Sequence, residues 1–305
     1  AGPAFIKVIW AELRSPIGGA ESAFTRIFAS LPARRALSLY GFGGELPFRG
    51  NISLSDEKVM LVESDEPLYW RARTYDVYNA WGWENGPLVV DDRRGLEDLA
   101  GSSFSTCPQC VRNITFDLRS PSATVYTAGT PLRTSLPVEA RYLASEGEEG
   151  VRLVKLESQR VLQPNKRYTV QAFIPIVTEE ALHAQADSYP QWVMEQFLAL
   201  PDDLSRRLVR LAETVTEDAQ DPYDKVVRIR DFLRTYEYSQ DIQAPPPGRD
   251  AVEFFLFGQK VGYSDYFGSA MVVLLRAVGI PARLAIGYAT GDYNLDVNAY
   301  VVRES

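Results

Sequence analysis

The chain has 305 residues, a length that corresponds to about two domains. Hydrophobic residues make up 46% and charged residues 24%, which is typical of a folded globular protein and excludes a disordered one. The net charge is −8 and no basic stripe is visible, so nucleic acid is excluded as a partner, and every apolar run is far shorter than the ~20 residues of a membrane-spanning helix.

The first half of the chain is predicted to be rich in β-strands. A short helix is expected over residues 6–13, but the later segments are rich in aromatic and β-branched residues. The strand candidates are residues 58–63, 68–75, 114–118, 123–127, 150–156 and 168–174. Because Pro, Gly and Ser turns separate these short segments, they predict an antiparallel sandwich or barrel. An acidic run at residues 146–149 is expected to form a solvated hairpin tip.

Two features of this half allow a functional interpretation beside a structural one. The aromatic residues between Tyr69 and Trp83 could form a carbohydrate platform, but such clusters more often build the core and edge of a sheet, which we expect here. Cys107 and Cys110 form a Cys-Pro-Gln-Cys motif. A disulfide that clips a turn, or a thiol pair between two strands, is favoured over a redox or zinc site, because a structural zinc site needs about four ligands.

The hydrophobic pattern changes from strand-like to helical near Pro175. We therefore expect two domains, a β-rich and sandwich-like one over residues 1–175 and a second one over residues 176–305. Thr178 is expected to cap a short helix, and Asp221-Pro222 to begin a longer one, because Ser, Thr and Asp favour the N-cap and Pro favours the first helical position.

One stretch, residues 262–283, dominates the second domain. It reads Gly-Tyr-Ser-Asp-Tyr-Phe-Gly-Ser-Ala and later Leu-Leu-Arg-Ala-Val-Gly-Ile-Pro-Ala-Arg. Its apolar residues recur at helical spacing and leave almost no polar face, which predicts a buried helix. Gly279 is expected to end this helix in the left-handed conformation, and a strand should follow over residues 284–288. Ser264 then lies in the first turn, where backbone N–H groups and the helix dipole favour negative charge.

This stretch resembles the nucleophile motif of transglutaminase-like domains, in particular those of the bacterial membrane-anchored transglutaminase family. In that family the third residue of the Gly-Tyr-Cys motif is the catalytic cysteine, and Ser264 occupies its position here. The resemblance covers residues 176–305 well and residues 50–175 loosely. It implies an α+β fold in which a β-rich N-terminal domain precedes a papain-like core, in a region of the protein outside the cytoplasm.

The resemblance also bears on the other catalytic residues. The family's catalytic His and Asp lie on strands after the nucleophile, and this sequence ends at residues 301–305, about where the His-bearing strand should begin. We therefore expect a core truncated at its C-terminal strands. His183 is the chain's sole histidine but precedes the nucleophile position, so we expect it to be a surface or packing residue.

A serine at position 264 predicts a catalytically silent domain. A papain-like thiol attacks a carboxamide because the helix N-terminus and an imidazolium lower its pKa from ~8.5, whereas a helix dipole worth ~0.3–1 kcal/mol does not ionise a hydroxyl. Ser264 is then a natural replacement, or an engineered Cys→Ser change that disables a thiol acyltransferase or protease. A serine nucleophile with a base from elsewhere is less favoured, and an N-cap hydroxyl needs no chemistry at all.

No cofactor or metal is predicted. Residues 292–298 alternate Asp and Asn as a calcium loop does, but Val297 stands where such a loop needs Gly, so a polar hairpin turn is favoured. The expected partner is a protein or peptide, either as the substrate of an acyl transfer or as the ligand of a non-enzymatic scaffold that uses the same cleft.

Overall fold

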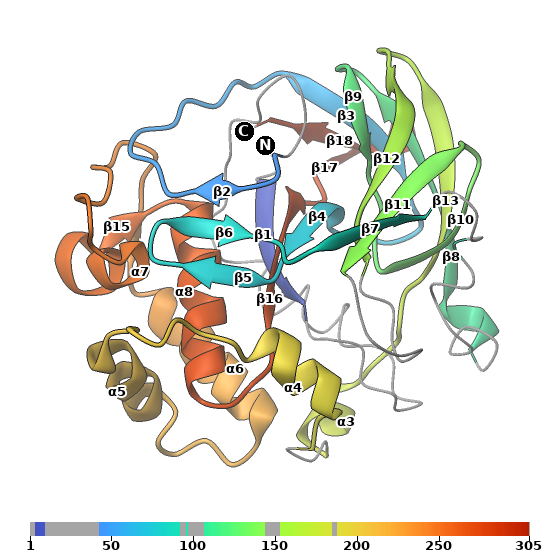
Figure 1. Ribbon diagram of the computed structural model, residues 1–305. Coiled ribbons are helices and arrows are strands. Elements are labelled where there is room, and N and C mark those ends of the chain that lie inside the picture. Colours follow the sequence, from blue (N-terminus) through green and yellow to red (C-terminus); the bar gives the residue numbers. More distant parts are fainter. Residues whose placement is uncertain are drawn as a thin grey trace.

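The structure is a computed structural model, and it describes residues 4–9, 43–91, 96, 107–143, 153–184 and 188–304. These residues form the expected α+β fold. In Figure 1 the helices gather at the lower left, and strands of the N-terminal half fan out at the right. The helix α8, which begins at Ser264, lies between the other helices and the strands.

Two sheets hold most of the described strands. A seven-stranded sheet has the order β1-β16-β4-β12-β11-β7 with β9 beside β12, and a six-stranded sheet has the order β10-β13-β8-β3-β18-β17. The strands of the first sheet are β1 Ala4–Ile9, β16 Arg283–Tyr288, β4 Trp70–Tyr75, β12 Leu153–Leu162, β11 Val138–Leu143, β7 Leu88–Asp91 and β9 Ser122–Val125. Those of the second are β10 Thr130–Thr134, β13 Arg167–Phe173, β8 Val111–Leu118, β3 Lys58–Glu63, β18 Ala299–Arg303 and β17 Asp292–Asn294.

The two sheets pack face to face, as predicted for a sandwich. On β8, Ile114, Phe116 and Leu118 are buried on one face, and the residues between them are only partly buried. The Trp70 ring of β4 meets the Phe116 ring edge to face, with centroids 5.7 Å apart. Aromatic side chains from both sheets therefore form the core between them.

The helices lie in the second half of the chain, as expected. They are α3 Glu179–His183, α4 Gln191–Phe197, α5 Arg206–Val215, α6 Pro222–Leu233, α7 Ala251–Glu253 with the π-helix η3 Phe254–Gln259, and α8 Ser264–Ala277; a 3-10 turn, η2, covers Pro108–Cys110. Thr178 and Asp221 cap α3 and α6 with their side chains, which confirms both predicted starts. Among the described residues, no helix is long and apolar enough to cross a membrane.

The helix predicted over residues 6–13 is wrong where the structure describes it. Residues Ala4–Ile9 form β1, which pairs antiparallel with β16 along its length. Ile6, Val8 and Ile9 are β-branched and favour a strand once β16 offers a partner. Residues 10–13 lie outside the described part of the chain, and so does the acidic run at residues 146–149.

Both sheets contain strands from either side of the expected domain boundary. The change from strand to helix lies between the end of β13 at Phe173 and the start of α3 at Glu179. However, β16 lies between β1 and β4, and β18 lies between β3 and β17. The division into two domains at residue 175 stays a prediction. If the chain is divided there, each of the two large sheets contains strands from both domains.

The structure decides three of the alternatives. Trp70, Tyr75 and Trp83 are fully buried, which confirms a core role for most of the aromatic run, whereas Trp81 is 51% exposed. Cys107 and Cys110 form the predicted disulfide at a turn. Residues 292–298 form β17 and the predicted turn of the hairpin that it makes with β18, where the Asp296 N–H donates to Asn294 Oδ1.

Three short pairings complete the fold. β2 Leu46–Pro47, β6 Gly82–Glu84 and β5 Val77–Asn79 form a small antiparallel sheet. β14 Glu237–Tyr238 and β15 Val261–Gly262 pair in parallel directly before α8. Gly279, with φ of 81°, ends the α8 segment in the predicted left-handed conformation.

Candidate functional site

The candidate site begins at the N-terminus of α8. Tyr263, in an extended conformation, is the N-cap, and Ser264 is the first helical residue with 3% of its surface exposed. The interpretation of Ser264 as an N-cap hydroxyl is therefore wrong by one residue. Its hydroxyl points to the neighbouring carboxylate instead, with Oγ 3.4 Å from Asp265 Oδ1.

This environment does not favour an ionised serine. The N-terminus of a 14-residue helix attracts negative charge, but the buried carboxylate of Asp265 is already there. A second negative charge on Ser264 Oγ would lie beside that carboxylate, and like charges in a buried site disfavour ionisation. Helix position alone therefore leaves the hydroxyl neutral.

Two tyrosines fix the start of α8 against the N-terminal half of the chain. Tyr263 and Tyr266 both donate their hydroxyl hydrogen to the carbonyl oxygen of Arg49, at 3.0 and 2.8 Å. Gly262 is needed before them, because a Cβ there would lie 3.0 Å from both Phe255 Cε2 and Tyr266 Cβ. The Gly-Tyr-Ser-Asp-Tyr motif resembles a nucleophile motif, and its glycine and tyrosines also anchor the start of α8.

The remainder of α8 is anchored by polar groups in the core. Trp83 Nε1 donates to Ser269 Oγ at 2.8 Å. The guanidinium of Arg276 donates to three carbonyl oxygens, those of Ala282, Ala199 and Asp76, at 2.8, 2.6 and 2.8 Å. Burial lowers the pKa of Arg276 to about 9, so the group is charged at neutral pH. These bonds connect α8 to the segment before β16, the segment after α4 and the residue between β4 and β5.

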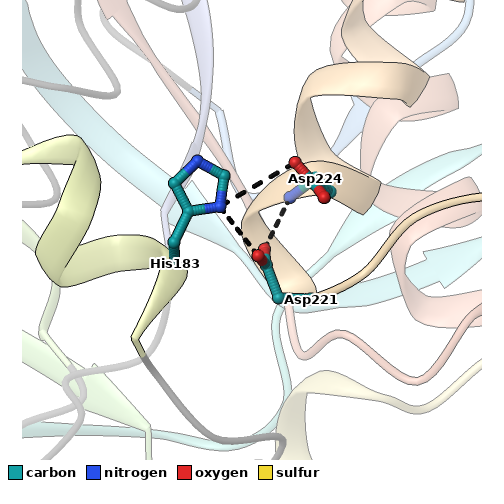
Figure 2. Close-up of side chains that lie close together, drawn as sticks. All are labelled: His183, Asp221 and Asp224. Carbon is teal, nitrogen blue, oxygen red and sulfur yellow. Dashed lines mark hydrogen bonds and ion pairs between the residues drawn. The ribbon is translucent and has the colours of Figure 1, made fainter.

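His183 lies in a different cluster, at the junction of α3 and α6 (Figure 2). Its Nδ1 is 2.7 Å from Asp221 Oδ2 and 3.9 Å from Asp224 Oδ1, and its ring meets the ring of Tyr223 edge to face. All of these partners belong to α6 or its cap. With 44% of its side chain exposed, His183 is a surface packing residue, as predicted, and no contact among the described residues joins it to Ser264.

The charges of this cluster stabilise one another. The hydrogen bond to Asp221 raises the pKa of His183. Burial opposes ionisation of Asp221, but the hydrogen bond with His183 and the Asp224 N–H outweigh it and lower the pKa of that carboxyl. His183, Asp221 and Asp224 are also close enough to hold a cation, with ligand atoms within 4.8 Å of one another. The carboxylates already accept backbone N–H groups of Asp224 and Gln220, so the cluster is explained as a helix-to-helix contact.

The sequence contains a signal for the buried Arg276 but none for the contact between His183 and Asp221. An arginine inside the apolar run of α8 is a visible signal, and Arg276 is indeed paired in the core. The contact of His183 with Asp221 joins residues 38 apart on separate helices, which no local spacing indicates. No described contact connects that cluster to the nucleophile position.

Comparison with known proteins places a transglutaminase-like domain in the chain. The model of the transglutaminase-like superfamily matches residues 209–304, which include α8 and the strands β16, β17 and β18 after it. The uncharacterized protein YebA of Bacillus subtilis is 30% identical over 258 residues, which are 77% of this chain and 33% of that protein. A protein-glutamine gamma-glutamyltransferase of Pseudomonas aeruginosa is 22% identical over 240 residues, 78% of this chain and 32% of that protein.

Two solved structures share the fold. Both are of the periplasmic domain of TgpA from Pseudomonas aeruginosa. One superimposes with a TM-score of 0.59 at 19% identity and covers 87% of this chain and 86% of that one. The other, bound to ethylmercury, gives 0.54 at 21% identity and covers 82% of each chain. The fold is therefore that of a transglutaminase-like domain behind a β-rich N-terminal region, and the chain spans about a third of the curated relatives it matches.

Proposed function

We propose that this chain is an extracytoplasmic region of a membrane-anchored bacterial protein of the transglutaminase family, and that it is catalytically silent with Ser264 in the nucleophile position. The observation that carries the proposal is the place of Ser264: the first residue of the buried helix α8, within the part of the chain that matches the transglutaminase-like superfamily. That is where the resemblance puts a cysteine.

Two further observations support inactivity. A hydroxyl has a far higher pKa than a thiol, and an adjacent general base is required to activate it. His183 pairs with Asp221, the N-cap of α6, and no contact within the described part of the chain joins it to Ser264. The Asp265 carboxylate beside Ser264 Oγ opposes development of negative charge.

Two observations support a location outside the cytoplasm. The Cys107–Cys110 disulfide fits an oxidising compartment, where such bonds persist. The solved structures with the same fold are periplasmic domains. Alkaline phosphatase fused after residue 305 in the natural protein should be active in cells, since this enzyme needs its own disulfides. A fusion that is inactive while the protein is present at normal levels would place the region inside the cytoplasm.

An acyl-transfer assay tests whether the protein is catalytically inactive. Wild-type protein should not incorporate a fluorescent primary amine, monodansylcadaverine, into casein, and should not release ammonia from a glutamine peptide. Incorporation that is lost in Ser264→Ala would show a serine nucleophile and overturn the proposal. Ser269→Ala is the matched control, because Ser269 lies on the same helix and its hydroxyl accepts from Trp83.

A Ser264→Cys variant distinguishes two hypotheses: a thiol enzyme whose cysteine is replaced, and a non-enzymatic scaffold. Cys107 and Cys110 are in the disulfide, so position 264 would carry the single free thiol, and alkylation by iodoacetamide against pH reports its pKa. Burial and Asp265 raise that pKa while the helix N-terminus lowers it, so we expect a value within about one unit of the ordinary ~8.5. A pKa several units lower, with amine incorporation, would instead identify a thiol acyltransferase whose nucleophile is replaced.

A further inference from the structure

A polar groove lies on the six-stranded sheet, away from α8. It has a volume of about 540 Å³, within the usual range of small-molecule sites. Its lining comes from the end of β3 and the turn after it, from β8 and from the β17–β18 hairpin, which are labelled in Figure 1. The lining residues are Glu63, Ser64, Asp65, Asn113, Thr115, Tyr293, Asn298 and Tyr300.

Two tyrosine rings form the apolar part of this groove. Tyr293 and Tyr300 face each other across the hairpin as a register pair, and their rings meet at 65° with centroids 5.0 Å apart. Tyr300 also lies against the buried Trp70, which holds it in place. Tyr293 is 46% exposed, so one ring is fixed by the core and the other offers a surface to a ligand.

The polar groups of the groove are of both hydrogen-bonding kinds. Asn298 Oδ1 accepts from the Tyr293 hydroxyl at 2.6 Å, and Asn113 Oδ1 accepts from Gln171 Nε2 at 3.3 Å. Each of these amides also carries an NH₂ group, which is a hydrogen-bond donor. The carboxylate of Asp65 has no hydrogen bond or ion pair with the described residues, and a carboxylate is a hydrogen-bond acceptor.

This set selects one class of ligand. Glu63 is already paired with Arg167 at 2.6 Å, so Asp65 is the carboxylate that would repel an anion, and no basic residue is among those that line the groove. A cation would pair with Asp65 but would leave the NH₂ donors of Asn113 and Asn298 unpaired. A hydroxyl both donates and accepts, so a polyol satisfies both kinds of group, and the C–H faces of a sugar ring pack on aromatic rings. We propose that the Tyr293–Asp65 groove is a binding site for a neutral carbohydrate chain, independent of the site at Ser264.

The test is calorimetric titration of the full chain with three neutral trisaccharides, chitotriose, cellotriose and maltotriose. We expect at least one to bind with a dissociation constant of about 1 mM or tighter, as suits an open groove with few polar contacts. Tyr293→Ala and Asp65→Asn should each weaken this binding by about tenfold, the size of one lost ring contact or charge-assisted hydrogen bond.

Two controls keep the outcome decisive. Trp81→Ala removes an exposed aromatic residue from the β5–β6 hairpin and should leave binding unchanged. Tyr293→Phe keeps the aromatic ring and should keep most of the affinity for the sugar. A loss of binding in Tyr293→Ala alone is then due to the missing ring and not to misfolding. The proposal is overturned if no trisaccharide binds at 10 mM, if Tyr293→Ala binds as wild type while its thermal unfolding is unchanged, or if spermidine binds in the groove where the sugars do not.

Discussion

At the scale of single residues, Arg276 is a buried charge in the core, with 3% of its surface exposed. Its guanidinium satisfies three buried carbonyl oxygens and packs on Trp83, with the cation 5.3 Å from the ring centroid. Arg276→Met keeps most of the side-chain volume but leaves those oxygens without donors. Since each buried unpaired group costs about 1–3 kcal/mol, we expect the free energy of unfolding in urea to fall by at least about 3 kcal/mol.

The matched control for Arg276 is Arg234. It lies just after α6, is 45% exposed, and pairs with Asp231 at 3.6 Å on the surface. Arg234→Met should change the free energy of unfolding by less than about 0.5 kcal/mol. If the two variants lose similar stability, the three carbonyl contacts do not hold α8 in place.

His183 gives a prediction about charge. Because its hydrogen bond to Asp221 raises its pKa, the ion pair stabilises the protein fully below the unfolded value of ~6.5, and this contribution is lost as pH rises through the folded value. The chain has one histidine, so its ring resonance in proton NMR is unambiguous. We expect a titration midpoint above ~6.5 in the wild type.

Asp221→Asn tests the cause of that shift. Asparagine caps a helix about as well as aspartate, so α6 should keep its N-cap while the negative charge is removed. The midpoint of His183 should then move back toward ~6.5. Asp218→Asn, a change at an 82% exposed carboxylate that pairs with Arg228, is the control. An unchanged midpoint in Asp221→Asn would mean that another group sets the pKa of His183.

At the scale of elements, the contact of β16 with β4 depends on a glycine. The register between these strands shifts at Gly287, where the backbones come unusually close. A Cβ at Gly287 would overlap the carbonyl oxygen of Trp70 and lie 2.9 Å from Arg71 Cα. Backbone atoms cannot rotate away as a side chain can, so Gly287→Ala should cost at least about 2 kcal/mol in the free energy of unfolding.

Gly44→Ala is the control for this substitution. A Cβ at Gly44 would meet open space, and its backbone is not in the left-handed region. We expect a change within about 0.5 kcal/mol in the same urea titration. Equal effects of the two substitutions would mean that the strands β16 and β4 separate readily to admit a methyl group.

The sequence predicts elements whose pattern is local. The helix α8, its glycine end, the strands 58–63 and 168–174 and the caps Thr178 and Asp221 follow from periodicity and from single residue types. The helix expected over residues 6–13 overlaps β1, because Ile6, Val8 and Ile9 are apolar and only the pairing with β16 decides between helix and strand. Local pattern cannot supply a partner strand that lies nearly 280 residues later.

The candidate sites differ in the same way: a site marked by local sequence could be predicted, and a site built from distant segments could not. The place of Ser264 in the first turn of α8 could be predicted, because the helix start is marked by local residues; its assignment as the nucleophile position stays a prediction. The groove at Tyr293 could not be predicted, since its lining comes from three separated segments that meet only in the six-stranded sheet. The contact between His183 and Asp221 was missed for the same reason.

At the scale of the whole molecule, the shared sheets predict cooperative unfolding. The strands β16 and β18 of the second expected domain are hydrogen-bonded to β4 and β3 of the first. Separating the two halves would expose the edges of both sheets and the aromatic core between them. We therefore expect a single calorimetric transition, with a van't Hoff enthalpy close to the calorimetric one, in spite of a length that suits two domains.

A fragment of residues 176–305 provides the complementary measurement. In it β16 and β18 would lose their β4 and β3 neighbours, and unpaired strand edges favour aggregation over folding. We expect this fragment to lack a cooperative thermal transition and to form soluble aggregates in light scattering. Two resolved transitions in the full chain, together with a monomeric fragment that unfolds cooperatively, would show instead that the helical half folds by itself and that the sheets merely join two independent domains.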